Sequence, residues 1–397
     1  MARRPSLPPF VAAGVRLLAL AGIALAAACA ARLDRPVVQP DAVRLDYLGG
    51  VAYPPNTVGL ARSGLRLGSF SALAFDRVGG RWLAASDDVQ QPRLAWLDVD
   101  VASGAPAVSV RGVLMLTASA DTAARAALDR LDMEGLVVLP DGSFVVSNEG
   151  HTDRDGVRRQ PALLGVSRDG VVTTVSHPPD GYAIAATAGV GVRHNLGLES
   201  LTRTPDGRLV SGLEQPLAQD GPVSSASRGG RVRLIEFRAD GAAWRPGREW
   251  AYDLDPTPRQ PGYGAACQDG ENGLADLYAL DDRRFVALER ACLVGAADAP
   301  AFNPVRLYLV DVSGAEDVSS RASLTGATVR PAQKRLLLDL TTVAARMPAA
   351  LATLSNFEGI AEGPPAPDGS RTLLLVSDDN FRATQTLAFV WLKLRGL

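Results

Sequence analysis

Lysine is nearly absent from this sequence, since Lys334 and Lys393 are the only two among 41 basic residues. The basic residues balance 43 acidic ones, and the net charge at pH 7 is −2. Binding to nucleic acid requires a clustered positive charge, so this balance excludes a nucleic-acid partner. Gly-x-Ser-x-Gly, His-Glu-x-x-His and Walker motifs are also absent, which removes support for serine-triad, zinc-protease and nucleotide-hydrolysing functions.

A long apolar run is missing as well. Only about a dozen residues separate Arg16 from Cys29, whereas a membrane-spanning helix needs about 20. A short apolar stretch that follows arginines and ends in small residues is typical of a secretory signal. Its end, Ala26 to Cys29, resembles a bacterial lipobox. We therefore expect residues 1–29 to be a lipoprotein leader, with lipidation of Cys29 as the only membrane anchor, and the protein to be periplasmic or attached to the outer membrane. Cleavage near this point without lipidation is the alternative.

Cysteine is scarce, and Cys267 and Cys292 are the only two outside the leader. An exported protein meets an oxidising compartment, so we expect these two residues to form a disulfide. Closing the loop between them is worth roughly 3 to 4 kcal/mol in the chain-entropy model. Two unpaired buried cysteines are the alternative, because a sequence does not show the distance between them.

What the chain does contain is a repeat of strand, tight turn and strand. Three copies begin with Glu before a small residue, pass through Pro-Asp-Gly and end in acidic residues; they start at Glu134, Glu199 and Glu358. Two weaker copies have Ser71 and Asn272 in place of Glu. Proline presets the turn, and Asp and Gly accept the bend that follows. The copies begin about 65 to 85 residues apart, a spacing that suits one four-stranded propeller blade with its loops.

The repeats predict an all-β fold, a β-propeller with six blades, five of them visible in the sequence; five or seven blades are the alternatives. The expected boundaries are a leader at 1–29, an N-terminal segment with the first strands at 30–66, and the propeller at 67–397. Helices are expected only at 123–132 and 340–350. The last strand, at 386–394, is expected to complete the first blade and so close the ring.

Four segments carry a more specific resemblance. Asp132–Leu136, Asn195–Leu201, Asn356–Ala361 and Ser377–Phe381 resemble the bacterial phytase-like family described as having esterase-like activity of phytase. The resemblance covers roughly residues 67–394. It implies a secreted or periplasmic phosphoesterase-type hydrolase that acts on a small-molecule phosphate ester. We expect such a protein to be a monomer.

The repeated glutamates are the first candidates for a site. The inner strand of each blade lines the channel of a propeller, so Glu134, Glu199 and Glu358 should converge at one end. Ionised carboxylates crowd together only around a cation or with strongly raised pKa values. Hard oxygen donors favour calcium or magnesium, and we expect Ca²⁺. In the alternative interpretation each Glu binds backbone N–H groups of a neighbouring blade and only joins the repeats.

Further candidates surround these glutamates. The return strands end in a second acidic set, which comprises Asp87, Asp88, Glu149, Glu214, Glu289, Asp378 and Asp379. From this set we expect Glu149, Glu214 and Asp378 to join the metal ligands. Polar side chains at the same rim are the expected substrate-binding residues, namely Asn148, Asn195, Asn380, Arg203, Arg290 and Arg382, because guanidinium groups match phosphate. Glu134, Glu199 and His194 are the catalytic candidates, with His194 as the proton-transfer group.

Three functions remain open at this point. The first is metal-assisted hydrolysis of a phosphate ester, in which Ca²⁺ neutralises phosphoryl oxygens and a carboxylate positions water. The second is a calcium-dependent lactonase or sugar-ester hydrolase, and the third is a non-catalytic envelope propeller that binds a ligand.

Overall fold

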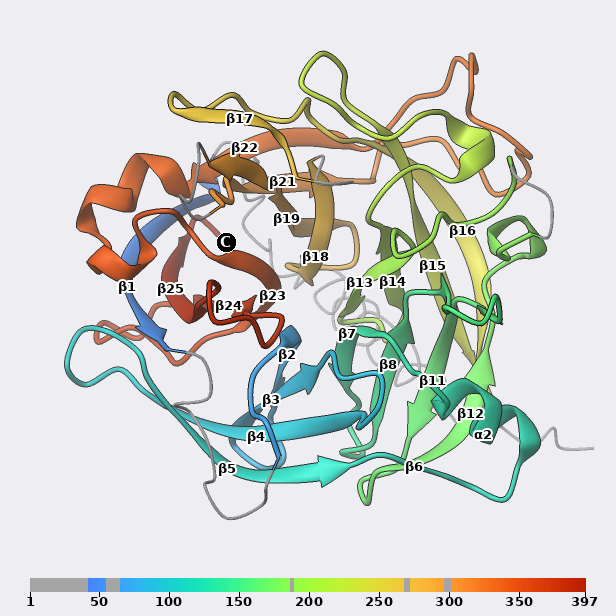
Figure 1. Cartoon of the computed structure of the whole chain (residues 1–397), viewed down its shortest axis with the longest axis horizontal. Helices are drawn as coiled ribbons and strands as arrows, with labels where there is room; N and C mark the ends of the chain where they lie inside the picture. The colour runs from blue at the N-terminus through green and yellow to red at the C-terminus, as the bar shows by residue number, and fades with distance from the viewer. Residues whose placement is uncertain (1–41, 55–64, 186–188, 268–271, 296–300) are drawn as a thin grey trace, which may run out of the picture. The chain divides into compact units, whose positions relative to one another are not determined.

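The strands form five sheets that surround a central channel (Figure 1). The computed structural model describes residues 42–54, 65–185, 189–267, 272–295 and 301–397. All strands belong to the unit that runs from Val43 to Arg395. The expected leader and Cys29 lie outside the described residues. In the part of the chain that the structure describes, none of the helices has both the length and the apolar character needed to cross a membrane.

Each sheet is one blade whose inner strand borders the channel. From the inner to the outer strand, the first blade contains β2 (Phe70–Asp76), β3 (Arg81–Ser86), β4 (Arg93–Asp100) and β5 (Ala107–Met115); the second contains β7 (Met133–Val138), β8 (Phe144–Asn148), β11 (Ala162–Val166), β12 (Val171–Ser176) and the short β6 (Thr117–Ala118); the third contains β13 (Leu198–Arg203), β14 (Leu209–Leu213), β15 (Arg231–Asp240) and β16 (Ala243–Asp253); the fourth contains β18 (Gly273–Ala279), β19 (Arg284–Arg290), β21 (Val305–Asp311) and β22 (Gln333–Asp339); the fifth contains β23 (Asn356–Glu362), β24 (Thr372–Asp378), β25 (Leu387–Arg395) and β1 (Arg44–Tyr53). The inner strands β2, β7, β13, β18 and β23 lie next to one another around the channel.

The described residues thus form five blades, the smaller alternative to the six that we expected. The five sequence copies account for every blade, so no degenerate sixth copy exists among them. Closure also differs from the expectation. The C-terminal strand β25 pairs with β24 inside its own blade, and β1 from the N-terminal side adds the outermost strand of that blade. Residues before position 67 therefore complete the ring.

Outside the blades, two short ribbons pair β9 (His151–Thr152) with β10 (Arg158–Arg159) and β17 (Tyr263–Ala266) with β20 (Leu293–Gly295). The helix expected at 123–132 is α2 (Thr122–Leu128). Its N-terminus is capped by Asp121, whose side chain accepts a hydrogen bond from the Ala124 N–H at 3.0 Å. The second expected helix is a pair of 3-10 helical turns at Leu340–Arg346 and Ala349–Leu351; further 3-10 turns lie at Asp180–Tyr182 and Ala218–Asp220.

The repeated Pro-Asp-Gly segments form the hairpin turns that the sequence predicts. Gly142, Gly207 and Gly369 have φ values of +82°, +94° and +76°, a conformation that residues with a Cβ rarely adopt. Apolar side chains fill the space between blades. For example, Phe70 and Trp391 belong to one buried cluster that joins the first and fifth blades. Burial of side chains of this size is worth about 1.5 to 3 kcal/mol each.

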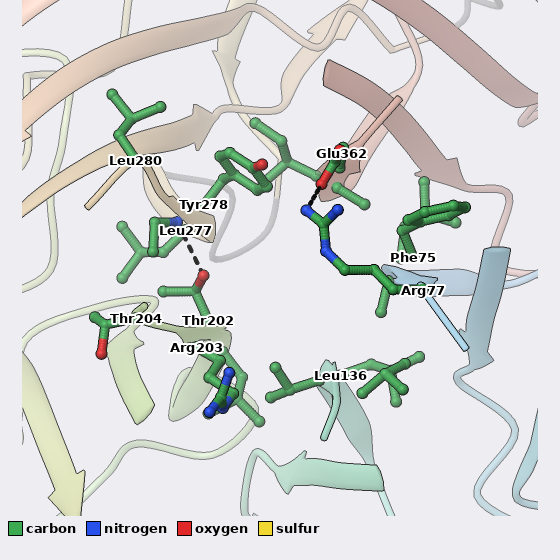
Figure 2. Close-up of a pocket in the computed structure, with 18 of the residues that line it drawn as sticks. Phe75, Arg77, Leu136, Thr202, Arg203, Thr204, Leu277, Tyr278, Leu280 and Glu362 are labelled. Atoms are coloured by element: carbon green, nitrogen blue, oxygen red, sulfur yellow. Dashed lines mark hydrogen bonds and ion pairs between the residues drawn. The ribbon is translucent and has the colours of Figure 1, made fainter. Parts of the chain in front are cut away.

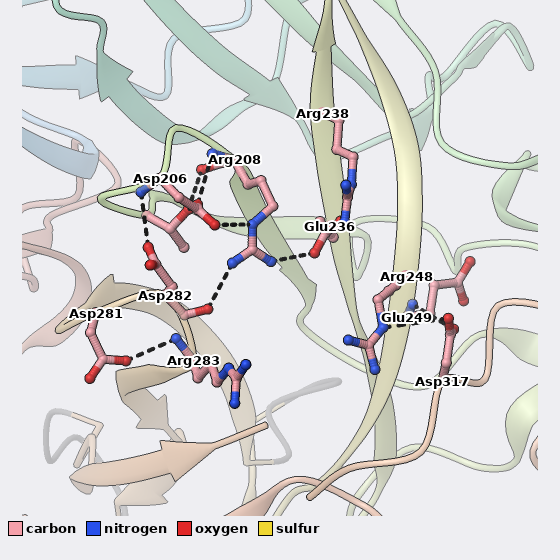
Figure 3. A network of polar contacts seen from close by, with 11 residues as sticks. Asp206, Arg208, Glu236, Arg238, Arg248, Glu249, Asp281, Asp282, Arg283 and Asp317 are labelled. Atoms are coloured by element: carbon pink, nitrogen blue, oxygen red, sulfur yellow. Dashed lines mark hydrogen bonds and ion pairs between the residues drawn. The ribbon is translucent and has the colours of Figure 1, made fainter. Parts of the chain in front are cut away.

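Polar contacts also join neighbouring blades. In Figure 3, the guanidinium of Arg208 donates to Asp206 Oδ2 at 2.7 Å and to the carbonyl of Asp282 at 2.9 Å, and it also pairs with Glu236. The backbone N–H of Asp206 donates to Asp282 Oδ1 at 2.9 Å. These bonds tie the turn after β13 to the turn after β18 and so fix the third blade against the fourth.

Candidate active site at one end of the channel

Each inner strand carries a β-bulge near its first residues. The ladder with the second strand skips one or two residues at the same place in all five blades. The residues at the bulge are Ser71, Glu134, Glu199, Ala275 and Glu358. A bulge re-aims a side chain, and here it turns the glutamates towards the channel. In the fourth blade the equivalent of Glu is Ala275, three residues after the Asn272 that the sequence alignment placed there.

A second ring is formed by the residue that follows the bulge partner in each return strand. Its members are Asp87, Glu149, Glu214, Arg290 and Asp378. The sequence assigned Glu289 to this ring, and the ladder shows that Arg290 takes the place. Because successive residues of a strand point to opposite faces, Glu289 faces the blade interior, where Tyr252 and Lys334 donate to its carboxylate at 2.6 and 2.5 Å.

The two rings open into one cavity of about 560 Å³ at this end of the channel. Its six lining carboxylates are Asp87, Glu134, Glu199, Glu214, Glu358 and Asp378. The expected convergence of Glu134, Glu199 and Glu358 is therefore present. Among the described residues no backbone N–H donates to any of these three side chains, which argues against the interpretation that they only join the blades.

Arg290 provides the positive charge inside the cavity. One guanidinium nitrogen lies 2.8 Å from Glu358 Oε1 and 3.7 Å from Glu199 Oε1, and another lies 3.3 Å from Glu214 Oε1. The Arg290 side chain is 12% exposed. Three carboxylates already surround the Arg290 guanidinium, so it acts first as their counterion. The sequence predicted a substrate contact for Arg290 and did not predict these ion pairs.

Burial and mutual repulsion raise the pKa values of the carboxyl groups. Desolvation, followed by the charges of Glu199 and Asp87, raises the pKa of Glu134 well above its usual range. Desolvation and the charge of Asp378 raise the pKa of Glu358 to about 8, although Arg290 opposes this effect. Desolvation raises the pKa of Asp378 to about 6. So many costly negative charges in one cavity favour a cation.

Glu134, Glu149 and Glu199 are the carboxylates best placed to hold one. Each offers an oxygen, and these oxygens lie within 4.8 Å of one another. Gly197 N–H donates to Glu149 Oε1 at 2.9 Å, while the buried Oε2 accepts no hydrogen bond within the described residues. A carboxylate-only donor set with a free buried oxygen fits a hard divalent ion such as Ca²⁺. Glu358 is outside this set because it pairs with Arg290.

The remaining predicted residues divide between the rim and other places. His194, Asn195, Asn380 and Arg382 line the cavity. His194 is exposed, and its Nδ1 accepts from the Thr152 N–H at 3.2 Å, so the neutral ring carries its proton on Nε2.

Asn148 does not reach the cavity, because its amide accepts from the Asp132 N–H at 3.0 Å and donates to the Gln160 carbonyl at 2.7 Å. Arg203 was also misplaced, since it lies four residues, or about 13 Å of strand, beyond Glu199 and lines the opposite end of the channel.

Two residues of the second acidic set are structural. Asp88 Oδ2 pairs with Arg93 at 2.7 Å, and Asp379 Oδ1 accepts from the Ser69 N–H at 2.7 Å. Two other groups beside the cavity were missed. Asp132 lies with Asp87 and Glu134 in a second carboxylate set, and His151 Nδ1 lies 3.0 Å from Asp132 Oδ2. The position of Asp132, two residues before Glu134, is the signal that could have identified it, because alternate residues of a strand share a face.

The opposite end of the channel is closed off from this cavity. Five aliphatic side chains, two residues after each bulge, form a layer across the channel: Leu73, Leu136, Leu201, Leu277 and Ile360. They line a second cavity of about 410 Å³ (Figure 2) that shares no residue with the first. Between the two ends, the buried carboxylate of Asp276 accepts from the backbone N–H groups of Leu277 and Ile360, both at 2.8 Å.

The sequence pairing of Cys267 with Cys292 is confirmed. The two residues form a disulfide with their Cα atoms 5.3 Å apart, and both line the acidic cavity. The bond fixes the chain that follows Arg290.

Comparisons with known proteins were made on the whole chain. A family model described as "Phytase-like: Esterase-like activity of phytase" matches residues 65–381. No curated protein matches. Similar solved structures include an endo-arabinase from Bacteroides thetaiotaomicron VPI-5482, with 13% identity, a TM-score of 0.44 and coverage of 86% of this chain and 97% of that chain. A glycosyl hydrolase from Bacteroides ovatus has 11% identity, a TM-score of 0.43 and coverage of 90% and 91%.

Proposed function

The chain belongs to the phytase-like family, and we propose on this basis that it is a hydrolase of small-molecule phosphate esters whose active site is the acidic cavity. The observation that carries the proposal is the convergence of six buried or half-buried carboxylates and Arg290 in one cavity. Carboxylates on their own repel a phosphate ester. A divalent cation held by Glu134, Glu149 and Glu199 would reverse the local charge and supply binding for phosphoryl oxygens.

The chain's own residues divide the remaining work. Arg290 keeps Glu214 and Glu358 in place through its ion pairs. Arg382 is exposed at the rim, where its planar guanidinium can bind the substrate phosphate. Asn195 lies at the same rim and offers an amide to a substrate oxygen.

Two groups are placed for proton transfer. His194, with its proton on Nε2, can donate that proton to the leaving oxygen of the ester. Glu199 faces the centre of the cavity and can orient the attacking water. Both side chains line the same cavity, which is the first geometric requirement for joint action.

The test measures phosphate release from phytate and from simple phosphomonoesters, with calcium and with a chelator. Hydrolysis should require calcium and fall about 100-fold or more in Glu199→Gln, which removes a charge with little change of volume. Glu362→Gln is the matched control, because Glu362 lies at the far end of β23 and pairs with the exposed Arg77. Its activity should equal that of the wild type.

Other outcomes separate the alternatives. Lactone or sugar-ester opening without phosphate release would replace the proposal with a lactonase-type hydrolase. Binding of such compounds without any turnover would indicate a ligand-binding propeller. Equal phosphate release by the wild type and Glu199→Gln would remove the active site from this cavity.

We also propose export, with Cys29 lipidated. The disulfide between Cys267 and Cys292 supports export because such bonds persist in oxidising compartments. Palmitate labelling of the expressed protein should disappear in Cys29→Ser. Labelling that persists in this variant would contradict lipidation of Cys29.

A further inference from the structure

Two sets of carboxylates, and not one, lie in the acidic cavity. Glu134, Glu149 and Glu199 form the first, and Asp87, Asp132 and Glu134 form the second; in each, one oxygen per residue lies within 4.8 Å of the others. Glu134 belongs to both sets. The five residues do not combine into a single set within that distance, so they surround two centres with Glu134 between them.

The positive charge of the cavity is on one side of these sets. Arg290 contacts Glu214, Glu358 and, at 3.7 Å, Glu199. No lysine or arginine forms an ion pair with Asp87, Asp132, Glu134 or Glu149 within the described ranges. The ring of His151 beside Asp132 is the nearest basic group at that edge. The two sets therefore need positive charge that the chain does not supply.

Unpartnered oxygens give an independent indication. Asp87 Oδ1 and Glu149 Oε2 are buried, and neither accepts a hydrogen bond in the part of the chain that is described. The Glu149 residue is only 1% exposed. One such oxygen belongs to each set. Leaving a buried charged oxygen without a partner is costly, and one ligand at each centre would satisfy both.

We propose that the cavity binds two divalent cations, with the carboxylate of Glu134 bridging them. Glu149 and Glu199 complete the first site, and Asp87 and Asp132 complete the second. The all-carboxylate donor set selects a hard ion, for which calcium is the probe. The proposal rests on the single cation site of the proposed function and extends it. Two adjacent cations would bind two oxygens of one phosphoryl group, as in other two-metal phosphoesterase sites.

The test counts bound calcium. Protein stripped with a chelator is titrated with CaCl₂ in a calorimeter, and the stoichiometry is checked by mass spectrometry under non-denaturing conditions. The wild type should bind two equivalents. Asp87→Asn and Glu149→Gln should each bind one, because each removes a ligand from one set only. Glu134→Gln should lose high-affinity binding at both sites, and Glu362→Gln at the other channel end should bind two.

Each result has a consequence. One equivalent in the wild type, or two in Asp87→Asn, overturns the second site, and loss of one equivalent in Glu134→Gln overturns the bridge. If Glu134→Gln fails to fold by circular dichroism, the Asp87 and Glu149 variants decide. Ester hydrolysis is measured on the same samples. Two equivalents without hydrolysis would contradict the proposed function and leave this inference standing, whereas one equivalent with hydrolysis would do the reverse.

Discussion

The two ends of the channel are built by the same five inner strands and hold different charges. The first residues of these strands border a cavity with six carboxylates around Arg290, whereas their last residues border one with three arginines and Glu362. The side chain of Arg290 is 12% exposed and that of Arg77 is 71% exposed. Charges at the first end are therefore desolvated and interact strongly, while water screens those at the second end.

The bulge accounts for the difference. All five inner strands carry it at the acidic end, and it turns an additional side chain from each blade towards the channel. Without a bulge at the other end, aliphatic side chains close the channel and the arginines lie outside them. The same scaffold thus concentrates interacting charges at one mouth, and experiments on matched residues can test this contrast.

The largest expected effect is that of removing the buried cation. Arg290→Gln should destabilise calcium-free protein by about 3–5 kcal/mol, because the carboxylates of Glu214 and Glu358 lose their counterion in a buried site. Urea unfolding gives the free energy of unfolding. Arg203→Gln at the other end is the control and should change this free energy by less than about 0.5 kcal/mol. Equal losses in the two variants would show that burial does not distinguish the two mouths.

A somewhat smaller effect is expected from the disulfide, which also lines the acidic cavity. The double variant Cys267→Ser/Cys292→Ser should be about 3 kcal/mol less stable, since a bond across a separation of 25 residues restricts the unfolded chain. Unfolding in urea with and without reductant measures this. The wild type should lose the same free energy on reduction, and the double variant should not respond. A wild type that is indifferent to reductant would contradict a stabilising role.

The sequence was sufficient to predict the propeller and the acidic mouth, because both follow from repeated local patterns. Pro-Asp-Gly turns and aliphatic strands indicate a hairpin by themselves. The recurrence of Glu134, Glu199 and Glu358 at the same place in that hairpin indicates one ring. Closure of the ring was predicted with the wrong strand, since the pairing of β1 with β25 depends on contacts between the two ends of the chain.

The fourth blade shows why the rest of the site could not be predicted. Asn272-Gly273 looks like Glu-Gly in sequence, but the bulge lies at Ala275. A shift in the return strand by one residue exchanges the two faces of a strand, and so Arg290, not Glu289, enters the cavity. The ion pairs of Arg290 join three blades through contacts distant in sequence, and a local pattern does not reveal them.

The smallest predicted effects compare the two sides of the aliphatic layer. Asp276 accepts hydrogen bonds from Leu277 and Ile360 on the acidic side. Thr202 Oγ1, on the other side, accepts one from Ala279 N–H at 2.9 Å. Asp276→Asn replaces an acceptor oxygen by a donor that faces a backbone donor, so it should cost about 2 kcal/mol, while Thr202→Val loses a single bond and should cost about 1 kcal/mol. Urea midpoints with unchanged m-values would measure both. If Asp276→Asn were the milder change, the charged carboxylate would be a net burden in the channel, and the strands would be held there by their apolar layer alone.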